Sequence, residues 1–309
     1  MPLKWRKKVI LAKTETVYGT DPVPTGAANA IMISDVTINP LEGDNASRGL
    51  VRDTLGSEPT IPVGTHVSCE FSVEIAGAGA AGTAPAYGPL LRACAMAETI
   101  TALTDVQYDP VSSGEESATL YFNNDGNLHP LLGARGNVTI ELAANQIPHF
   151  KFRFIGLWSD PVAAALPTPD FTAFTTPIPV NNANTPTFTV HGYSGVMANV
   201  KFDLGNVVKH RDLVNSESVN FGDREAKGST SFEAPALGTK NFFTIAKAAT
   251  LDAVQVVHGL TAGNIVQFDA PKVQIQSPKY SESDGISMLD MSLNVTPNTG
   301  DDELKITVK

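Results

Sequence analysis

Alternation of apolar and polar residues marks several segments of this chain as strands with one buried face. From Val67 to Ile75 every second residue is apolar, and the residues between are serines and glutamates. The same two-residue period recurs over residues 150–154 and 289–295. Because successive side chains of a strand point to opposite faces, this period is typical of a sheet with one face on the core and one in water. The pattern predicts a mainly β protein.

These segments occur twice in the same order: strand, short apolar helix, Gly-Asn strand and long final strand. The first copy occupies residues 66–75, 89–97, 136–142 and 150–154, and the second occupies residues 228–233, 240–249, 263–268 and 288–295. Repetition on this scale indicates two copies of one unit. We predict two tandem β-sandwich or β-barrel units, each with a short flanking α-helix, at about residues 86–98 and 239–251. The two-residue period does not separate a sandwich from a barrel.

The composition changes sharply between residues 159 and 187, where six prolines stand among Ala, Thr and Asn. Proline removes a ladder donor and fixes φ, so this segment is predicted to be a linker or extended arm. It falls where the repeat places a boundary. The predicted division is a first unit at residues 1–160, a linker at 161–187 and a second unit at 188–309.

Residues 42–65 lack strand periodicity and contain several Gly and Pro residues, so they are predicted to form a long loop. Structureless loops of this length are uncommon in compact domains and usually have a function. An arm that reaches a neighbouring subunit is the favoured use, and a mobile surface loop is the alternative.

Charge and cysteine content exclude several classes of protein. The 22 Lys and Arg residues and 32 Asp and Glu residues give a net charge of −10, which argues against tight nonspecific binding of nucleic acid. Cys69 and Cys94 are too few for a disulfide framework and are expected to be buried free thiols, as suits a reducing, aqueous compartment. No apolar run approaches the roughly 20 residues that span a bilayer, so no membrane partner is expected.

No motif predicts an enzyme, a cofactor or a metal site. Residues 77–82 fit the spacing G-x-G-x-x-G, but the preceding strand alternates and Pro85 and Pro89 interrupt the expected helix, so a flexible connector is favoured over a dinucleotide site. The six histidines stand singly, without metal-ligand spacing. The acidic cluster at residues 301–303 is predicted to be a solvated turn.

Several segments, taken in order, resemble the tail tube proteins (major tail proteins) of long-tailed, non-contractile bacteriophages, the siphophages. They are Lys8–Pro22, Pro40–Asp44, Arg52–Gly56, Gly133–Val138, Ile155–Leu157 and Gly300–Ile306. The resemblance covers most of the chain outside the Pro-rich segment, and no single motif is diagnostic.

The resemblance implies a β-sandwich whose sheets join across subunits into a ring, with rings stacked into a tube through which DNA leaves the capsid. It also implies a tape measure protein and tail terminator and tail tip proteins as partners. The expected location is the virion, after synthesis in the host cytoplasm. Family members usually form hexameric rings with one sandwich per chain. Two sandwiches per chain would give rings of three chains with pseudo-six-fold symmetry.

A tube that conducts double-stranded DNA without binding it tightly needs a lumen that does not attract phosphate. We therefore expect the acidic residues at the alternate, polar positions of the repeated strands to line the lumen: Glu70, Glu74, Glu141, Glu233 and Asp290. Lys151 and Arg153 do not fit an acidic lining and are expected to lie outside or to pair with neighbours. The alternative is that all of these are ordinary solvent-facing residues.

In the long loop, an inter-ring contact is expected from Asp44, Arg48, Arg52 and Asp53. Two other functions remain open. The tube protein of a type VI or other contractile injection system shares the implied fold, although such chains are usually shorter. A sugar-binding β-sandwich module would need exposed aromatic clusters, yet only 7% of the residues are aromatic.

Overall fold

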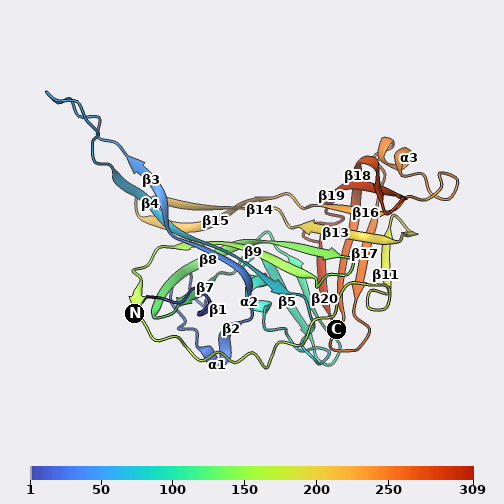
Figure 1. Ribbon diagram of the computed structural model, residues 1–309, viewed down its shortest axis with the longest axis horizontal. Coiled ribbons are helices and arrows are strands. Elements are labelled where there is room, and N and C mark those ends of the chain that lie inside the picture. The colour runs from blue at the N-terminus through green and yellow to red at the C-terminus, as the bar shows by residue number, and fades with distance from the viewer. Residues whose placement is uncertain (1) are drawn as a thin grey trace.

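One antiparallel sheet carries strands from both halves of the chain and connects the left and right parts of the molecule in Figure 1. The computed structural model describes residues 2–309, of which 52% lie in strands and 5% in helices, and this confirms the predicted mainly β class. In spatial order the sheet contains β3 (Ser34–Ala46), β4 (Ile61–Glu74), β9 (His149–Leu157), β8 (Asn127–Ala143), β13 (Met197–Asp203), β16 (Lys227–Glu233), β19 (Ile286–Thr296) and β18 (Val266–Ser283).

The first four strands of this order, β3, β4, β9 and β8, have counterparts in the next four. Smaller elements repeat as well. In the first half they are β1 (Lys8–Thr14), β2 (Ala30–Ile31), β7 (Ala118–Asn124) and β10 (Val162–Ala163). In the second half they are β11 (Thr187–Val190), β12 (Tyr193–Ser194), β17 (Leu251–His258) and β20 (Lys305–Val308). The repeat in the sequence is therefore a repeat of topology, although the Gly-Asn pairs at residues 136–137 and 263–264 are not equivalent, since the second pair precedes β18.

Two bulges fix the alignment of the halves residue by residue. A bulge in the β7–β8 pairing precedes the pair Leu120–Leu131, and a bulge in the β17–β18 pairing precedes the pair Val254–Ala270. Extending this match along the sheet makes the following positions equivalent: Asn137 and Gln276, Arg153 and Ser292, Glu70 and Ser229, His66 and Glu225, Thr37 and Lys201, and Glu141 and Ser281.

The two halves share one hydrophobic core beneath the long sheet. Phe152 and Phe154 of β9 stack on each other at 5.7 Å between ring centroids, and Phe71 of β4 contacts both. Phe150 meets Phe268 of the other half edge-on at 6.2 Å. Burying a large apolar side chain contributes about 1.5 to 3 kcal/mol, so contacts of this kind hold the halves in a fixed arrangement. The strands β5 (Met96–Thr101) and β6 (Asp105–Pro110) add a second connection, since β6 pairs with β20.

The helices are shorter than the sequence predicts. α2 covers Gly88–Arg92 and α3 covers Phe242–Lys247, and a third short helix, α1, covers Gly26–Asn29. Met96 already begins β5 and Leu251 begins β17, so the predicted ends at 98 and 251 are wrong. The reason is local: Ala95 and Ala249 have φ of 58° and 51°, and each turns the chain out of the helix.

The Pro-rich segment lies along the first half rather than hanging free. Val180 is buried, and its backbone exchanges hydrogen bonds with Asn145 and Gln146. The glycine loop at residues 77–82 is also packed, against the other half: Gly79 N donates to Gly263 O at 2.8 Å, and a Cβ on Gly77 would lie 2.1 Å from the same oxygen. The prediction of a flexible connector is therefore wrong, because glycine here permits a close backbone approach.

The predicted loop at residues 42–65 is the distal part of a β-hairpin. β3 runs to Ala46 and β4 begins at Ile61, so the loop prediction is right for residues 47–60 and wrong for residues 42–46 and 61–65. This arm, residues 42–66, projects from the body of the molecule (Figure 1). Sequence periodicity missed its strands because bulges break the β3–β4 pairing on both sides of Glu42. A bulge removes the two-residue alternation on which the prediction depends.

Both cysteines are buried free thiols, as predicted. Burial, followed by the charge of Glu70, raises the pKa of Cys69 to about 12, and burial also raises the pKa of Cys94. Because the thiolate is the reactive form, we expect neither thiol to react with iodoacetamide at pH 8 in the folded protein and both to react in urea. Mass spectrometry of the alkylated protein measures this, and rapid alkylation of Cys69 without denaturant would contradict it.

Candidate assembly surface

The polar face of the long sheet carries all five acidic residues predicted to line a lumen. Partners in an antiparallel pair point to the same side of a sheet, and the register places Glu70 opposite Arg153 and Glu141 opposite both His149 and Lys201. The remaining three, Glu74, Glu233 and Asp290, follow at even spacing on the same strands or their neighbours. One continuous face therefore contains residues that are far apart in the sequence.

Two of the five acidic residues on this face, Glu70 and Glu141, form ion pairs with basic neighbours. Arg153 Nε lies 3.2 Å from Glu70 Oε1, and Glu141 binds Lys151 at 2.6 Å and Lys201 at 2.9 Å. Lys151 and Arg153 thus pair with neighbours on the same face. Burial alone would raise the pKa of Glu141, but the two lysines outweigh it and hold that pKa below its usual value. Glu141 is consequently ionised at neutral pH.

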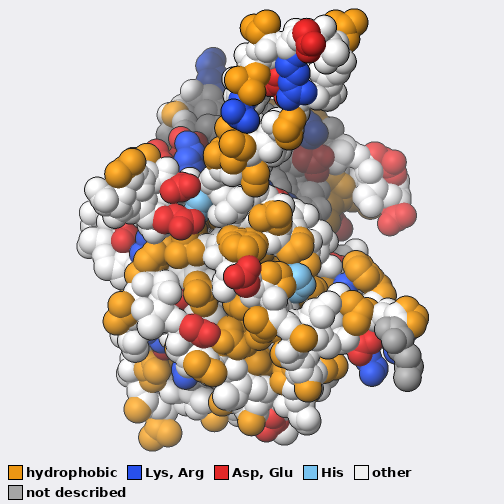
Figure 2. Space-filling model, turned by 90° about the vertical axis from the view of Figure 1, so that its left-hand side faces the viewer, with side chains coloured by type: hydrophobic (Ala, Val, Ile, Leu, Met, Phe, Trp, Pro, Cys, Tyr) orange, Lys and Arg blue, Asp and Glu red, His pale blue; other side chains and the backbone are white. Residues whose placement is uncertain are grey.

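The residues predicted for an inter-ring contact lie on the arm, away from this face. Asp44 belongs to β3, whereas Arg48, Arg52 and Asp53 stand in the exposed tip at residues 47–60. Exposed apolar side chains accompany them, among them Val51 and Leu55. Figure 2 looks onto this end of the molecule and shows hydrophobic and charged side chains together on the projecting arm. A solvent-exposed apolar patch on a projecting segment is typical of an interaction site.

The long sheet ends in two open edges. Where β8 pairs with β13, Glu141 stands opposite Lys201 and Ile140 is fully buried. The equivalent part of β18, residues 279–283, pairs only with β19 within residues 2–309, and Tyr280, equivalent to Ile140, is 55% exposed. At the other end β3 pairs only with β4 in the same range. Open edges present unpaired backbone donors and acceptors and invite a further strand.

A second hairpin, formed by β14 (Asn206–Leu213) and β15 (Ser216–Arg224), crosses the first half of the chain. It contacts β8 and β9, and β14 also reaches β4 (Figure 1). Asn137 Oδ1 accepts a hydrogen bond from Asn206 N at 2.9 Å, and the rings of His66 and His210 stack with centroids 5.0 Å apart. β13 is the counterpart of the inner part of β3, and the chain continues from β13 directly into β14. In the same way, the inner part of β3 continues into its outer part, which belongs to the arm. The β14–β15 hairpin is therefore the counterpart of the arm.

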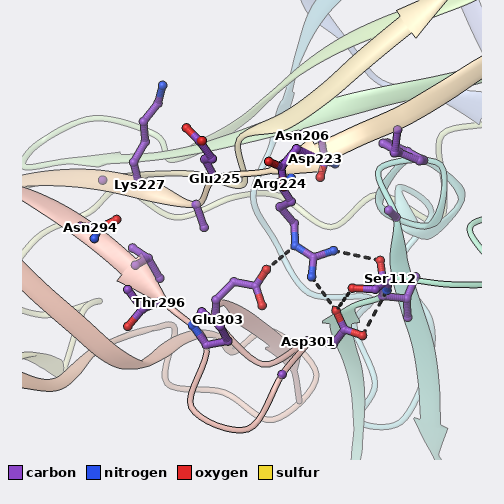
Figure 3. Close-up of a pocket in the computed structure, with 18 of the residues that line it drawn as sticks. Ser112, Asn206, Asp223, Arg224, Glu225, Lys227, Asn294, Thr296, Asp301 and Glu303 are labelled. Atoms are coloured by element: carbon purple, nitrogen blue, oxygen red, sulfur yellow. Dashed lines mark hydrogen bonds and ion pairs between the residues drawn. The ribbon is translucent and has the colours of Figure 1, made fainter.

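A groove of about 1100 Å³ lies over β16 and β19. Arg224 crosses one side of it and ties three segments together: its guanidinium binds Glu303, donates to Asp301 Oδ1 at 2.7 Å and donates to the carbonyl of Val111 at 2.9 Å (Figure 3). Ser112 N donates to Asp301 Oδ2 at 3.1 Å from the first half of the chain. The cluster therefore fastens the β19–β20 loop of the second half to the first.

The acidic cluster at residues 301–303 is thus more than the predicted solvated turn. Asp302 does accept turn hydrogen bonds from the amides of Asn298 and Thr299, but Glu303 is buried against Arg224. No local pattern predicts this contact, because Arg224 lies far from residue 303 along the chain. Within residues 2–309 no group of acidic, Cys and His residues has a metal-binding arrangement, and no helix is long and apolar enough to span a bilayer.

The fold and its surfaces define a class: a β-rich structural protein whose prominent features are open sheet edges and a projecting arm. A family model described as phage tail tube protein matches residues 5–300, so the chain belongs to the phage tail tube protein family. The resemblance seen in the sequence is confirmed. No curated protein matches the chain. Membership gives the protein a structural role in the virion, as a component of the phage tail tube.

Proposed function

We propose that three copies of this chain form each ring of the tail tube of a siphophage, and that stacked rings conduct double-stranded DNA during ejection. The observation that carries the proposal is the β8–β13 pairing, which joins the two halves of one chain edge to edge. The same relation repeated between copies pairs the open edge of β18 with β3 of the next chain. Head-to-tail contacts of this kind close into a ring when the rotation per step divides a full turn.

The alignment of the halves gives the register of this contact. Because Glu141 pairs with Lys201, the equivalent residue Ser281 is expected to stand opposite Thr37 of the next copy. Tyr280 then stands opposite Ile38, which covers its exposed ring. Each chain would contribute two units, namely residues 1–160 and 188–309, with residues 161–187 as the linker between them.

In such a ring the polar face of the long sheet lines the lumen, with Glu70, Glu74, Glu141, Glu233 and Asp290 on it. The paired lysines and arginine support a lumen that does not bind phosphate, because a cation already held by a carboxylate is less available to DNA. The arm tip with Arg48, Arg52 and Asp53 would contact the adjacent ring. Tape measure, tail terminator and tail tip proteins are the further partners that this role requires.

Electron cryomicroscopy of assembled tubes tests the ring. We expect three chains per ring, pseudo-six-fold density and Glu70 and Glu74 facing the lumen. Six chains per ring, or these glutamates on the outer wall, would refute the corresponding part of the proposal. A Thr37→Cys/Ser281→Cys double variant is expected to form interchain disulfides in tubes, since directly opposed residues of antiparallel strands lie within disulfide range. Each single variant is the control. The tube of a contractile injection system is the second candidate, and a sheath contact along the tube would favour it.

A further inference from the structure

The groove over β16 and β19 is the uncovered counterpart of a surface that is covered in the first half. There, the β14–β15 hairpin rests on β4, β9 and β8, where His66 stacks on His210 and Asn137 accepts a hydrogen bond from Asn206. In the second half the positions equivalent to His66 and Asn137 are Glu225 and Gln276. Both of these residues line the groove.

The segment that corresponds to the hairpin is the arm of the first half, residues 42–66. In its own chain the arm projects away from the body (Figure 1), and none of its residues belongs to the lining of the groove. It is long enough to cross the groove. The pair that closes it, Glu42 and His66, encloses more residues than the pair that closes the β14–β15 hairpin, Asn206 and Arg224.

We propose that the groove receives the arm of a second copy of this chain. The inference rests on the proposed ring, because the strand pairing of β18 with β3 of the next copy brings that copy's arm over β18, β19 and β16. The same arrangement exists within the chain: β13 pairs with β8, and the β14–β15 hairpin that follows β13 crosses β8, β9 and β4. In the ring, β3 of the next copy takes the place of β13, and its arm takes the place of the hairpin.

The lining of the groove contains a buried carboxylate oxygen that can accept a hydrogen bond from a backbone amide. Glu303 is only 5% exposed, and its Oε2 has no hydrogen-bond partner among the described residues although it belongs to the lining. A buried acceptor without a donor is costly, and an amide of the docked arm supplies one. The first half has a matching arrangement on its own hairpin, where the hydroxyl of Tyr18 accepts from Val219 N at 2.6 Å.

A photo-crosslinking side chain, p-benzoylphenylalanine, placed at Val63 tests the docking in assembled full-length tubes. Val63 lies on the arm and is exposed in the single chain. After irradiation and proteolysis, we expect interchain adducts on residues 221–228 or 292–297, as read by mass spectrometry. Asn294→Trp places a large ring in the groove and is expected to weaken binding of the arm. We expect the yield of these adducts to fall by about tenfold, which is the loss of occupancy that follows from a weakening of about 1.4 kcal/mol. The same probe in unassembled chain is the control and should give no interchain adduct.

The Thr37→Cys/Ser281→Cys disulfide separates failure of the docking from failure of the ring. If the disulfide forms but Val63 crosslinks elsewhere or not at all, the arm does not occupy the groove and the ring proposal stands. If neither the disulfide nor the adduct forms in tubes, both proposals are overturned. Adducts on the groove that persist undiminished in Asn294→Trp would also contradict the docking.

Discussion

Glu282→Pro is expected to abolish tube assembly while leaving the chain folded. The β18–β19 hairpin closes through Asp284 and Gly285, which both have positive φ, and Ser283 pairs with Ile286. In a two-residue hairpin of this type the flanking pair exchanges hydrogen bonds. The backbone groups of Ser283 and Ser281 therefore point toward β19, and those of Glu282 point outward to the open edge.

Proline at this position removes an outward N–H and places its ring against an incoming strand. A carbonyl of the incoming strand is then left unpaired, at a cost of about 1 to 3 kcal/mol. That corresponds to roughly a five- to 150-fold loss of affinity at each interface, and a ring requires every interface. Sedimentation and electron microscopy measure assembly, and circular dichroism measures the fold. Glu282→Ala is the matched control, because it removes the same side chain and keeps the N–H. Tubes of normal yield from Glu282→Pro would show that this edge is not an interface.

The repeat was predictable because β4, β9 and β19 each have one buried face and therefore show the two-residue alternation in the sequence. The open edges of the sheet were not predictable. Tyr280 and Ile140 occupy equivalent positions, and only the structure shows that Tyr280 lacks the neighbouring strand that covers Ile140. Edge pairing depends on what lies beside a strand, and a single strand's alternation carries no information about that.

The lumen candidates illustrate the same limit. Alternation placed Glu70 and Glu141 on the polar side of their strands, and the register confirms that they share a face. The sequence could not show that Arg153 and Lys201 stand opposite them, because these pairs form between strands distant in the chain. The arm was recognised as unusual from its length alone, and its bulges hid the strands. The Arg224 cluster brings together three loops and had no local pattern at all.

Arg224→Ala is expected to destabilise the chain by about 3 to 5 kcal/mol, the usual cost of removing one partner of a buried ion pair. The side chains of Arg224 and Glu303 are only 13% and 7% exposed, so the variant leaves the Glu303 carboxylate buried without its cation. It also removes the hydrogen bond that Arg224 donates to the carbonyl of Val111 in the first half of the chain. Urea unfolding of unassembled protein at pH 7 measures the loss. Asp301→Asn, at the more exposed partner, is the control and should cost about 1 kcal/mol or less.

The pH dependence of unfolding gives the second readout for Arg224. The hydrogen bond from Ser112 and the charge of Arg224 lower the pKa of Asp301 in the folded chain. A carboxyl with a lowered folded pKa stabilises above its unfolded pKa of about 3.9 and loses that contribution as the pH falls. Wild type should therefore lose stability below about pH 4 more steeply than Arg224→Ala, in which only the Ser112 part of the shift remains. Parallel curves for the two proteins, or an Arg224→Ala variant as stable as wild type at pH 7, would show that Arg224 does not fasten the two halves.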